Sequence, residues 1–173
     1  MIRRTMLMGM ACLMAVSSGY VLAADEQALQ TALQKQMYRT KITLQQGMTA
    51  AEEQGQVISA KFELEDDKLD GKFQVSIFVT KGGKFNEVIV SFLNGKPGKP
   101  EALAGEELAE GKAQAAAMAK AKITLKAAVD KALTQAEGYR AIGITPSLKD
   151  GHAVASVVLL KDTEFKTVEL SLE

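Results

Sequence analysis

The sequence predicts an α+β fold made of two tandem copies of one unit, each a helical hairpin followed by a three-stranded antiparallel meander. Three observations lead to this prediction. Short matches recur in the same order about 80 residues apart. Apolar residues recur at helical spacing ahead of a glycine in each copy, and two independent hairpins give the same pattern of apolar cross-strand pairs.

The first 23 residues have the pattern of a secretory signal peptide. Arg3 and Arg4 precede an apolar stretch from Leu7 to Val16, and small residues lead to a cleavage site after Ala23 or Ala24. The apolar stretch is too short to span a bilayer comfortably, and no basic flank follows it. We therefore expect a periplasmic or secreted protein with no membrane span in the mature chain.

Removal of the signal peptide changes the chemistry that is available. Cleavage after Ala23 leaves 150 residues with a net charge of −2, and it removes Cys12, the only cysteine. Disulfides, thiolate nucleophiles and cysteine metal sites are then excluded. The full chain balances 21 basic against 21 acidic side chains and has no basic run, so nucleic acid is not an expected partner.

Internal matches set the boundaries of the two copies. Lys41-Ile42-Thr43-Leu44 recurs 81 residues later as Lys122-Ile123-Thr124-Leu125, whereas Asp70-Gly71 recurs 80 residues later as Asp150-Gly151. One residue is therefore expected to be lost near the first strand. Copy one is predicted over residues 24–96 and copy two over 105–173. The Gly- and Pro-rich segment 97–104 is the predicted linker.

Each copy is expected to begin with two helices. The first helix of copy one is predicted over residues 25–37, and its counterpart over about 106–121. Thr43 is the expected N-cap of the next helix, with Gln46 completing a capping box, and Thr124 caps the corresponding helix of copy two. Gly55 and Gly138 are expected to end these helices.

Two-residue turns then fix the register of the strands. A turn at Gly82-Gly83 pairs Val79 with Asn86, Ile77 with Val88, Val75 with Val90 and Phe73 with Phe92. A turn at Asp162-Thr163 pairs Val157 with Val168, Ala155 with Leu170 and Ala153 with Leu172. Both solutions give an apolar face that can pack against the helices. Because Thr resists positive φ, a different turn type or a bulge is expected at Asp162-Thr163.

The opposite face, which we call the mixed face, alternates polar with large apolar residues. Its apolar members are candidates for contacting a partner, since a fully solvated face does not ordinarily carry them. One alternative is that the two copies pack against each other here, or that a helix lies across this face. The candidate partner-binding residues are Phe78, Phe85, Ile89, Val158 and Phe165.

No catalytic, metal or cofactor site is predicted, and the protein is not expected to be an enzyme. The only histidine, His152, falls opposite Glu173 at an exposed strand edge, and no nucleophile motif accompanies it. Asp66–Gly71 resembles a calcium loop, but Lys68 and Ile77 occupy positions that require oxygen ligands. A hairpin turn is the preferred interpretation of that segment.

The order of these features resembles the PepSY domain family. In copy one the family's places are taken by Thr43-Leu44, Gly55, Asp70-Gly71, strands over 73–79 and 85–91, and Gly95-Lys96. Copy two repeats them, except that no Gly-Lys follows its last strand. The architecture also resembles that of the beta-lactamase inhibitory protein, a tandem repeat whose concave sheet caps an enzyme.

The resemblance implies a non-catalytic module that restrains or modulates a peptidase or another envelope protein through a sheet face. The alternative is a carrier or sensor for a small ligand or a metal, held in a groove between the copies. The partner, the oligomeric state and whether the copies share one continuous sheet are left open by the sequence.

Overall fold

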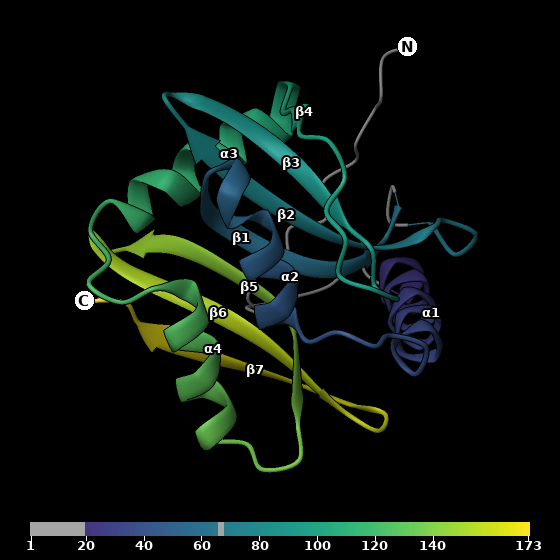
Figure 1. Cartoon of the computed structure of the whole chain (residues 1–173). Coiled ribbons are helices and arrows are strands. Elements are labelled where there is room, and N and C mark those ends of the chain that lie inside the picture. The colour runs from purple at the N-terminus through teal and green to yellow at the C-terminus, as the bar shows by residue number, and fades with distance from the viewer. Residues whose placement is uncertain (1–19, 66–67) are drawn as a thin grey trace.

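The computed structural model describes residues 20–65 and 68–173, which form four α-helices and one seven-stranded antiparallel sheet (Figure 1). The predicted α+β class is confirmed. Residues 1–19, most of the predicted signal peptide, lie outside the described residues. The elements are α1 (Tyr20–Met37), α2 (Leu44–Ala51), η1 (Glu52–Gln54), β1 (Gln56–Leu64), β2 (Phe73–Lys81), β3 (Lys84–Val90), β4 (Glu101–Ala102), α3 (Gly105–Met118), α4 (Leu125–Thr134), β5 (Arg140–Lys149), β6 (His152–Lys161) and β7 (Glu164–Ser171).

The strand order β4-β3-β2-β1-β5-β6-β7 answers the question of how the halves are joined. The meander β1-β2-β3 and the meander β5-β6-β7 form one continuous sheet, because β1 pairs antiparallel with β5. Ala60 lies opposite Ile144, and Lys61 lies opposite Gly143. No helix in the described part of the chain is both long enough and apolar enough to cross a membrane.

The first strands of the two halves correspond through their pairing. Ala60 lies opposite Ile77 in β2, and Ile144 lies opposite Val157 in β6. Each strand has a register shift at the matching place, between Val57 and Ser59 in β1 and between Ala141 and Gly143 in β5. A bulge sharpens the local twist, so both halves bend their first strand at the same point.

This correspondence corrects the expected position of the gap between the halves. The first strands are offset by 84 residues, against 81 for the helix caps and 80 for the second strands. The second half therefore has three more residues before its first strand and four fewer in its first hairpin. The prediction of one residue lost near the first strand is wrong in its detail, since two opposite length changes leave a net difference of one.

The helix caps form as predicted. Thr43 Oγ1 accepts a hydrogen bond from the Gln46 backbone at 3.1 Å, and Gln46 Oε1 accepts one from the Thr43 backbone at 2.8 Å. Thr124 Oγ1 accepts from the Ala127 backbone at 3.1 Å. These bonds satisfy backbone donors that have no partner within the first turn of a helix.

The predicted strand registers are confirmed as well. Both central glycines of the turn between Lys81 and Lys84 have positive φ, 58° and 76°. In the turn between Lys161 and Glu164, Asp162 has φ 50° while Thr163 has no positive φ, so the turn type differs as expected. Phe92 lies beyond the end of β3, but its ring packs edge to face against the ring of Phe73, with 4.8 Å between the two ring centres.

Helices α2 and α4 cover the apolar face of the sheet, which they overlie in Figure 1. Gly47 of α2 sits so close to β2 that a Cβ there would lie 3.2 Å from Val75. The apolar face is almost fully removed from water, as expected for the main source of folding free energy. Its buried members include Phe62, Phe73, Val75, Ile77, Val79, Val88, Val90, Ile144, Ala153, Ala155, Val157, Leu159 and Val168.

Helix α3 crosses the mixed face over β5 and β1 and reaches Phe85 of β3. Phe85 belongs to that face because it pairs with Thr80, next to Phe78 and Ser76 on alternate positions of β2 and β3. A Cβ on Gly111 of α3 would lie 3.5 Å from the Phe85 ring and 3.0 Å from Leu103. A helix therefore lies across part of the mixed face, which is one of the alternatives that the sequence left open.

Helix α1 reaches the opposite end of the sheet and contacts the second half (Figure 1). Gln34 donates to the carbonyl of Asp162 in the β6-β7 turn at 2.8 Å, and Arg140 of β5 donates to the carbonyl of Met37 at 3.1 Å. Each half thus sends its first helix to the other half, so the halves are held together by helices as well as by the sheet.

We expect Gly111→Val to lower the free energy of unfolding by about 1–3 kcal/mol, because the added side chain forces α3 away from Leu103 and Phe85. The matched control is Ala116→Val on the exposed side of the same helix, where only helix propensity changes, by about 0.6 kcal/mol. Urea unfolding measures both. Equal losses in the two variants would contradict the close packing of α3.

Candidate functional site

The structure places all five predicted partner-binding residues on the mixed face but does not bring them together. Phe78 is 6% exposed, whereas Phe85, Ile89, Val158 and Phe165 are half-buried. Ile89 and Val158 lie on the same row of the sheet, separated by four strand spacings, or roughly 19 Å. The five residues therefore form two groups, one in each half.

The mixed face is more open in the second half than in the first. Ser76 is 1% exposed while its counterpart Ser156 is half-buried, and Glu87 is half-buried while its counterpart Thr167 is exposed. Phe78 is likewise buried, whereas its counterpart Val158 is half-buried. Helix α3 lies mainly over β5 and β1, so the more accessible part of the mixed face is a surface on β6, β7 and the Thr145 end of β5. We call it the open surface: Thr145, Val154, Ser156, Val158, Phe165, Thr167 and Glu169.

A cluster of polar side chains occupies the mixed face of the first half. Lys61 pairs with Glu63, which accepts a hydrogen bond from Gln74 Nε2 at 3.0 Å. Ser76 Oγ donates to Glu87 Oε1 at 2.5 Å. Ser76 is buried and Glu87 is half-buried, so these two polar groups satisfy each other within the cluster.

Burial changes the acidity of two carboxyls in this region. Desolvation raises the pKa of Glu87, partly offset by the hydrogen bond from Ser76, and the neighbouring Glu63 and Glu107 raise it further. Desolvation also raises the pKa of Glu110, and Lys61 opposes that shift. Sequence reasoning missed this cluster, because only the position of α3 shows which acidic side chains are covered.

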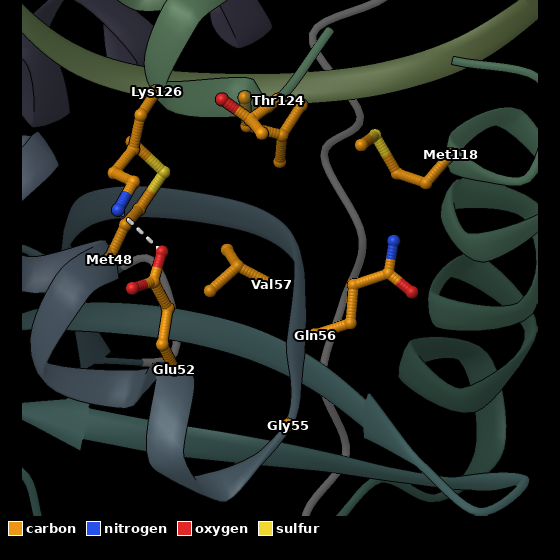
Figure 2. Close-up of a pocket in the computed structure, with 9 residues that line it drawn as sticks. Met48, Glu52, Gly55, Gln56, Val57, Met118, Thr124 and Lys126 are labelled. Carbon is orange, nitrogen blue, oxygen red and sulfur yellow. Dashed lines mark ion pairs between the residues drawn. The ribbon is translucent and has the colours of Figure 1, made fainter. Parts of the chain in front are cut away.

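A cavity of about 290 Å³ lies where the two halves meet (Figure 2). Lys126 of α4 reaches across to Glu52, with 2.6 Å between Lys126 Nζ and Glu52 Oε1, and also donates to Thr49 Oγ1 at 3.3 Å. Helices α2, α3 and α4 and the start of β1 therefore contribute to one site. The lining residues are Met48, Glu52, Gly55, Gln56, Val57, Met118, Thr124, Leu125 and Lys126.

The walls of this cavity are mainly apolar, with one ion pair at the side. Its volume is at the lower end of the range for small-molecule sites. The lining has one carboxylate and two thioethers, which suits a small organic molecule better than a hard metal ion. The sequence pointed to a groove between the copies but identified none of these residues, since Met48, Met118 and Leu125 had the pattern of core positions.

His152 lies at the strand edge as predicted, paired with Glu173 at 3.2 Å between His152 Nδ1 and Glu173 Oε2. The backbone N–H of Ala153 and the side chain of His152 lower the pKa of Glu173. This pair fastens the end of the chain to the start of β6, so it has a structural explanation.

The segment that resembled a calcium loop lies in the connection between β1 and β2, and Asp66 and Asp67 fall outside the described residues. Within the described ranges no group of three or more His, Cys, Asp or Glu side chains is arranged to hold a metal.

Comparison with protein families, with curated proteins and with solved structures found no match. The resemblance to PepSY domains therefore stays a prediction drawn from the residues quoted above.

We expect Glu87→Gln to stabilise the protein at pH 7. Folded Glu87 has a raised pKa, so the folded chain holds this proton more tightly than the unfolded chain. Ionisation of this carboxyl therefore lowers the free energy of unfolding as the pH rises from about 4.5 through the raised folded pKa. Below that pH range the carboxyl is protonated in both states and has no such effect. Glutamine keeps an acceptor for Ser76 without the charge.

Urea unfolding midpoints at pH 7 and at about pH 4 measure this effect, since an unperturbed carboxyl is mostly protonated at the lower value. The gain should vanish at the lower pH. Glu137→Gln on an exposed connection is the control and should change neither midpoint. A loss of stability at pH 7 in Glu87→Gln would show that the ionised carboxylate supports the fold.

Proposed function

We propose that this chain is a non-catalytic binding module of two tandem PepSY-like repeats, periplasmic or secreted, that modulates a peptidase or another envelope protein. Partner binding uses the open surface of the second half. The matching caps, bulges and hairpin registers of the two halves support the tandem-repeat interpretation. The order of those features along the sequence supports the comparison with PepSY domains.

The observation that carries the proposal is the difference in exposure between the two halves of the mixed face. In the first half α3 packs against Phe85, and Phe78 is buried. In the second half Val158 and Phe165 keep part of their apolar area exposed among Ser and Thr side chains. Partly exposed apolar groups within a polar surround are typical of the centre of a protein interface.

This arrangement divides the predicted contact residues by role. Val158 and Phe165 contact the partner directly in the proposed interface. Phe78 and Phe85 support α3 and shape the boundary of the open surface, and Ile89 lies on the far side of the polar cluster. An interface centred on β6 and β7 is therefore smaller and more polar than one that uses the whole mixed face.

Val158→Glu should weaken binding of the captured partner at least about tenfold, because it places a charge at the centre of the proposed interface. Mature protein is used to capture partners from envelope extract, and each retained protein is then titrated with both forms. The control is Leu148→Ser, which removes an exposed apolar side chain elsewhere on β5. A partner that binds Val158→Glu as tightly as the unmodified chain would exclude this surface.

A second candidate function is favoured by the cavity between the halves. A small amphiphilic molecule would place its apolar part against Met48, Val57 and Met118 and its polar end near the Glu52–Lys126 pair. Occupation of the site would link the two halves more firmly, which suits a ligand carrier or sensor.

Ligand binding to this cavity should raise the melting temperature, because the site does not exist in the unfolded chain. The probes are medium-chain carboxylates, alkylamines and aromatic acids at millimolar concentration. Gln56→Trp, at the exposed mouth of the cavity, should abolish any shift, whereas Lys84→Trp on a distant hairpin should leave it intact. An equal shift in both variants would place the binding elsewhere.

A further inference from the structure

The outer edge of β3 is covered by a segment of its own chain. Leu103 donates its backbone N–H to the carbonyl of Phe85 at 3.0 Å, and Gly98 donates to the carbonyl of Ile89 at 2.8 Å. Between these two bonds, β4 pairs Ala102 with Asn86. The segment 97–103 thus satisfies the outward-facing backbone groups of β3, which would otherwise be free to pair with another chain.

The matching edge of β7 has no such cover among the described residues, since β7 is the last strand in the sheet order. The backbone N–H of Leu172 donates to the carbonyl of Ala153 in β6 at 2.9 Å. Because backbone direction alternates along a strand, the backbone groups of Phe165, Thr167 and Glu169 point away from β6. Within the described part of the chain, a row of unpaired donors and acceptors therefore lines this edge.

We propose that the outer edge of β7 binds an extended segment of a partner protein as an additional antiparallel strand. The hydrogen bonds of segment 97–103 to Phe85 and Ile89 of β3 show how such a strand would pair. In the matching hairpin, Phe165 corresponds to Phe85 and Glu169 corresponds to Ile89. This inference goes beyond the proposed function: the edge recognises backbone, whereas the open surface recognises side chains.

Charge favours an acidic side chain in the bound segment. Asn86 faces Ala102 on β3, and the corresponding position on β7 is Lys166. Lys166 Nζ lies 5.9 Å from the centre of the Tyr139 ring, and Lys161 Nζ lies 5.7 Å from it. Glu164 lies opposite Lys161 and accepts a hydrogen bond from Tyr139, so two ammoniums surround the ring with this one neighbouring carboxylate among the described residues. An acidic residue opposite Lys166 would complete this cluster, since opposite charges across a strand pair are stabilising.

The bound segment does not need a leucine like Leu103. Leu103 fits against α3 because residue 111 is a glycine. A Cβ at position 111 would lie only 3.0 Å from the Leu103 side chain. The corresponding residue of α1 is Gln30, which is 81 residues before Gly111 and is not a glycine. Backbone pairing and charge therefore carry the recognition, and the edge tolerates different side chains elsewhere in the segment.

A second copy of this chain is a poorer occupant. A symmetric β7-β7 pairing must set residues of the same face opposite each other. Centred on Thr167 it places Lys166 opposite Val168, and centred on Val168 it places Lys166 opposite Leu170. Centred on Phe165 it places Lys166 opposite Glu164, but then only residues 164–166 of the two β7 strands face each other.

The test uses two fluorescent nine-residue peptides of alternating threonine and valine, one with glutamate and one with lysine at the centre. The full mature chain should bind the glutamate peptide about threefold more tightly, as expected for one cross-strand charge pair. Lys166→Glu should reverse the preference. Amide hydrogen exchange should slow at Thr167 and Glu169 when the peptide is added, because those N–H groups become hydrogen-bonded.

The decisive variant is Thr167→Pro, which removes an outward N–H and should weaken both peptides at least about tenfold, while an edge strand tolerates proline at such a position. The matched control Thr167→Val keeps the N–H and should bind within about twofold of the unmodified chain. If Thr167→Pro fails to fold, Glu169→Pro removes the next outward N–H and is tested in the same way.

Three results would overturn the proposal: no saturable binding of either peptide, unchanged binding by a folded proline variant, or a dimer of the unmodified chain that Thr167→Pro dissociates. The last result would identify a second copy as the occupant. Val158→Glu should leave peptide binding intact, so failure of the edge and failure of the open surface are distinguishable.

Discussion

The pairing of β1 with β5 is the constraint on which the rest of the structure depends. Each meander alone would expose the edge of its first strand and would offer only three strands to cover its helices. Joining them at Ala60 and Ile144 removes both edges and creates one apolar face wide enough for α2 and α4 together. Gly143 lies at this junction opposite Lys61.

The shared sheet also explains the course of the first helices. Because the two halves are antiparallel across β1 and β5, the helix that precedes one half emerges beside the hairpin tip of the other. Helix α3 reaches Phe85, and α1 reaches the carbonyl of Asp162. The two halves are therefore not independent units, and the mixed face of each is bounded by a helix from the other.

Small sequence differences then make the two halves unequal. Gly111 lets α3 approach the sheet closely and leaves room for Leu103, which brings the segment 97–103 along the edge of β3. The second half has no comparable covering segment among the described residues, and α1 has Gln30 at the corresponding position. The first half thus has a covered edge and the more buried mixed face, and the second half presents its edge and more of its mixed face to solvent.

Local sequence determined the caps, the strand registers and the hairpin turns, because each depends on residues close together in the chain. Thr43, Gln46 and the two glycines at 82 and 83 specify their structures without help from the rest of the molecule. The joining of the two meanders, the burial of Glu87 beneath α3 and the cavity beside Lys126 could not be predicted this way. Each depends on how segments far apart in the sequence pack, and the free energy that decides such packing belongs to the assembled sheet and helices, not to any short segment.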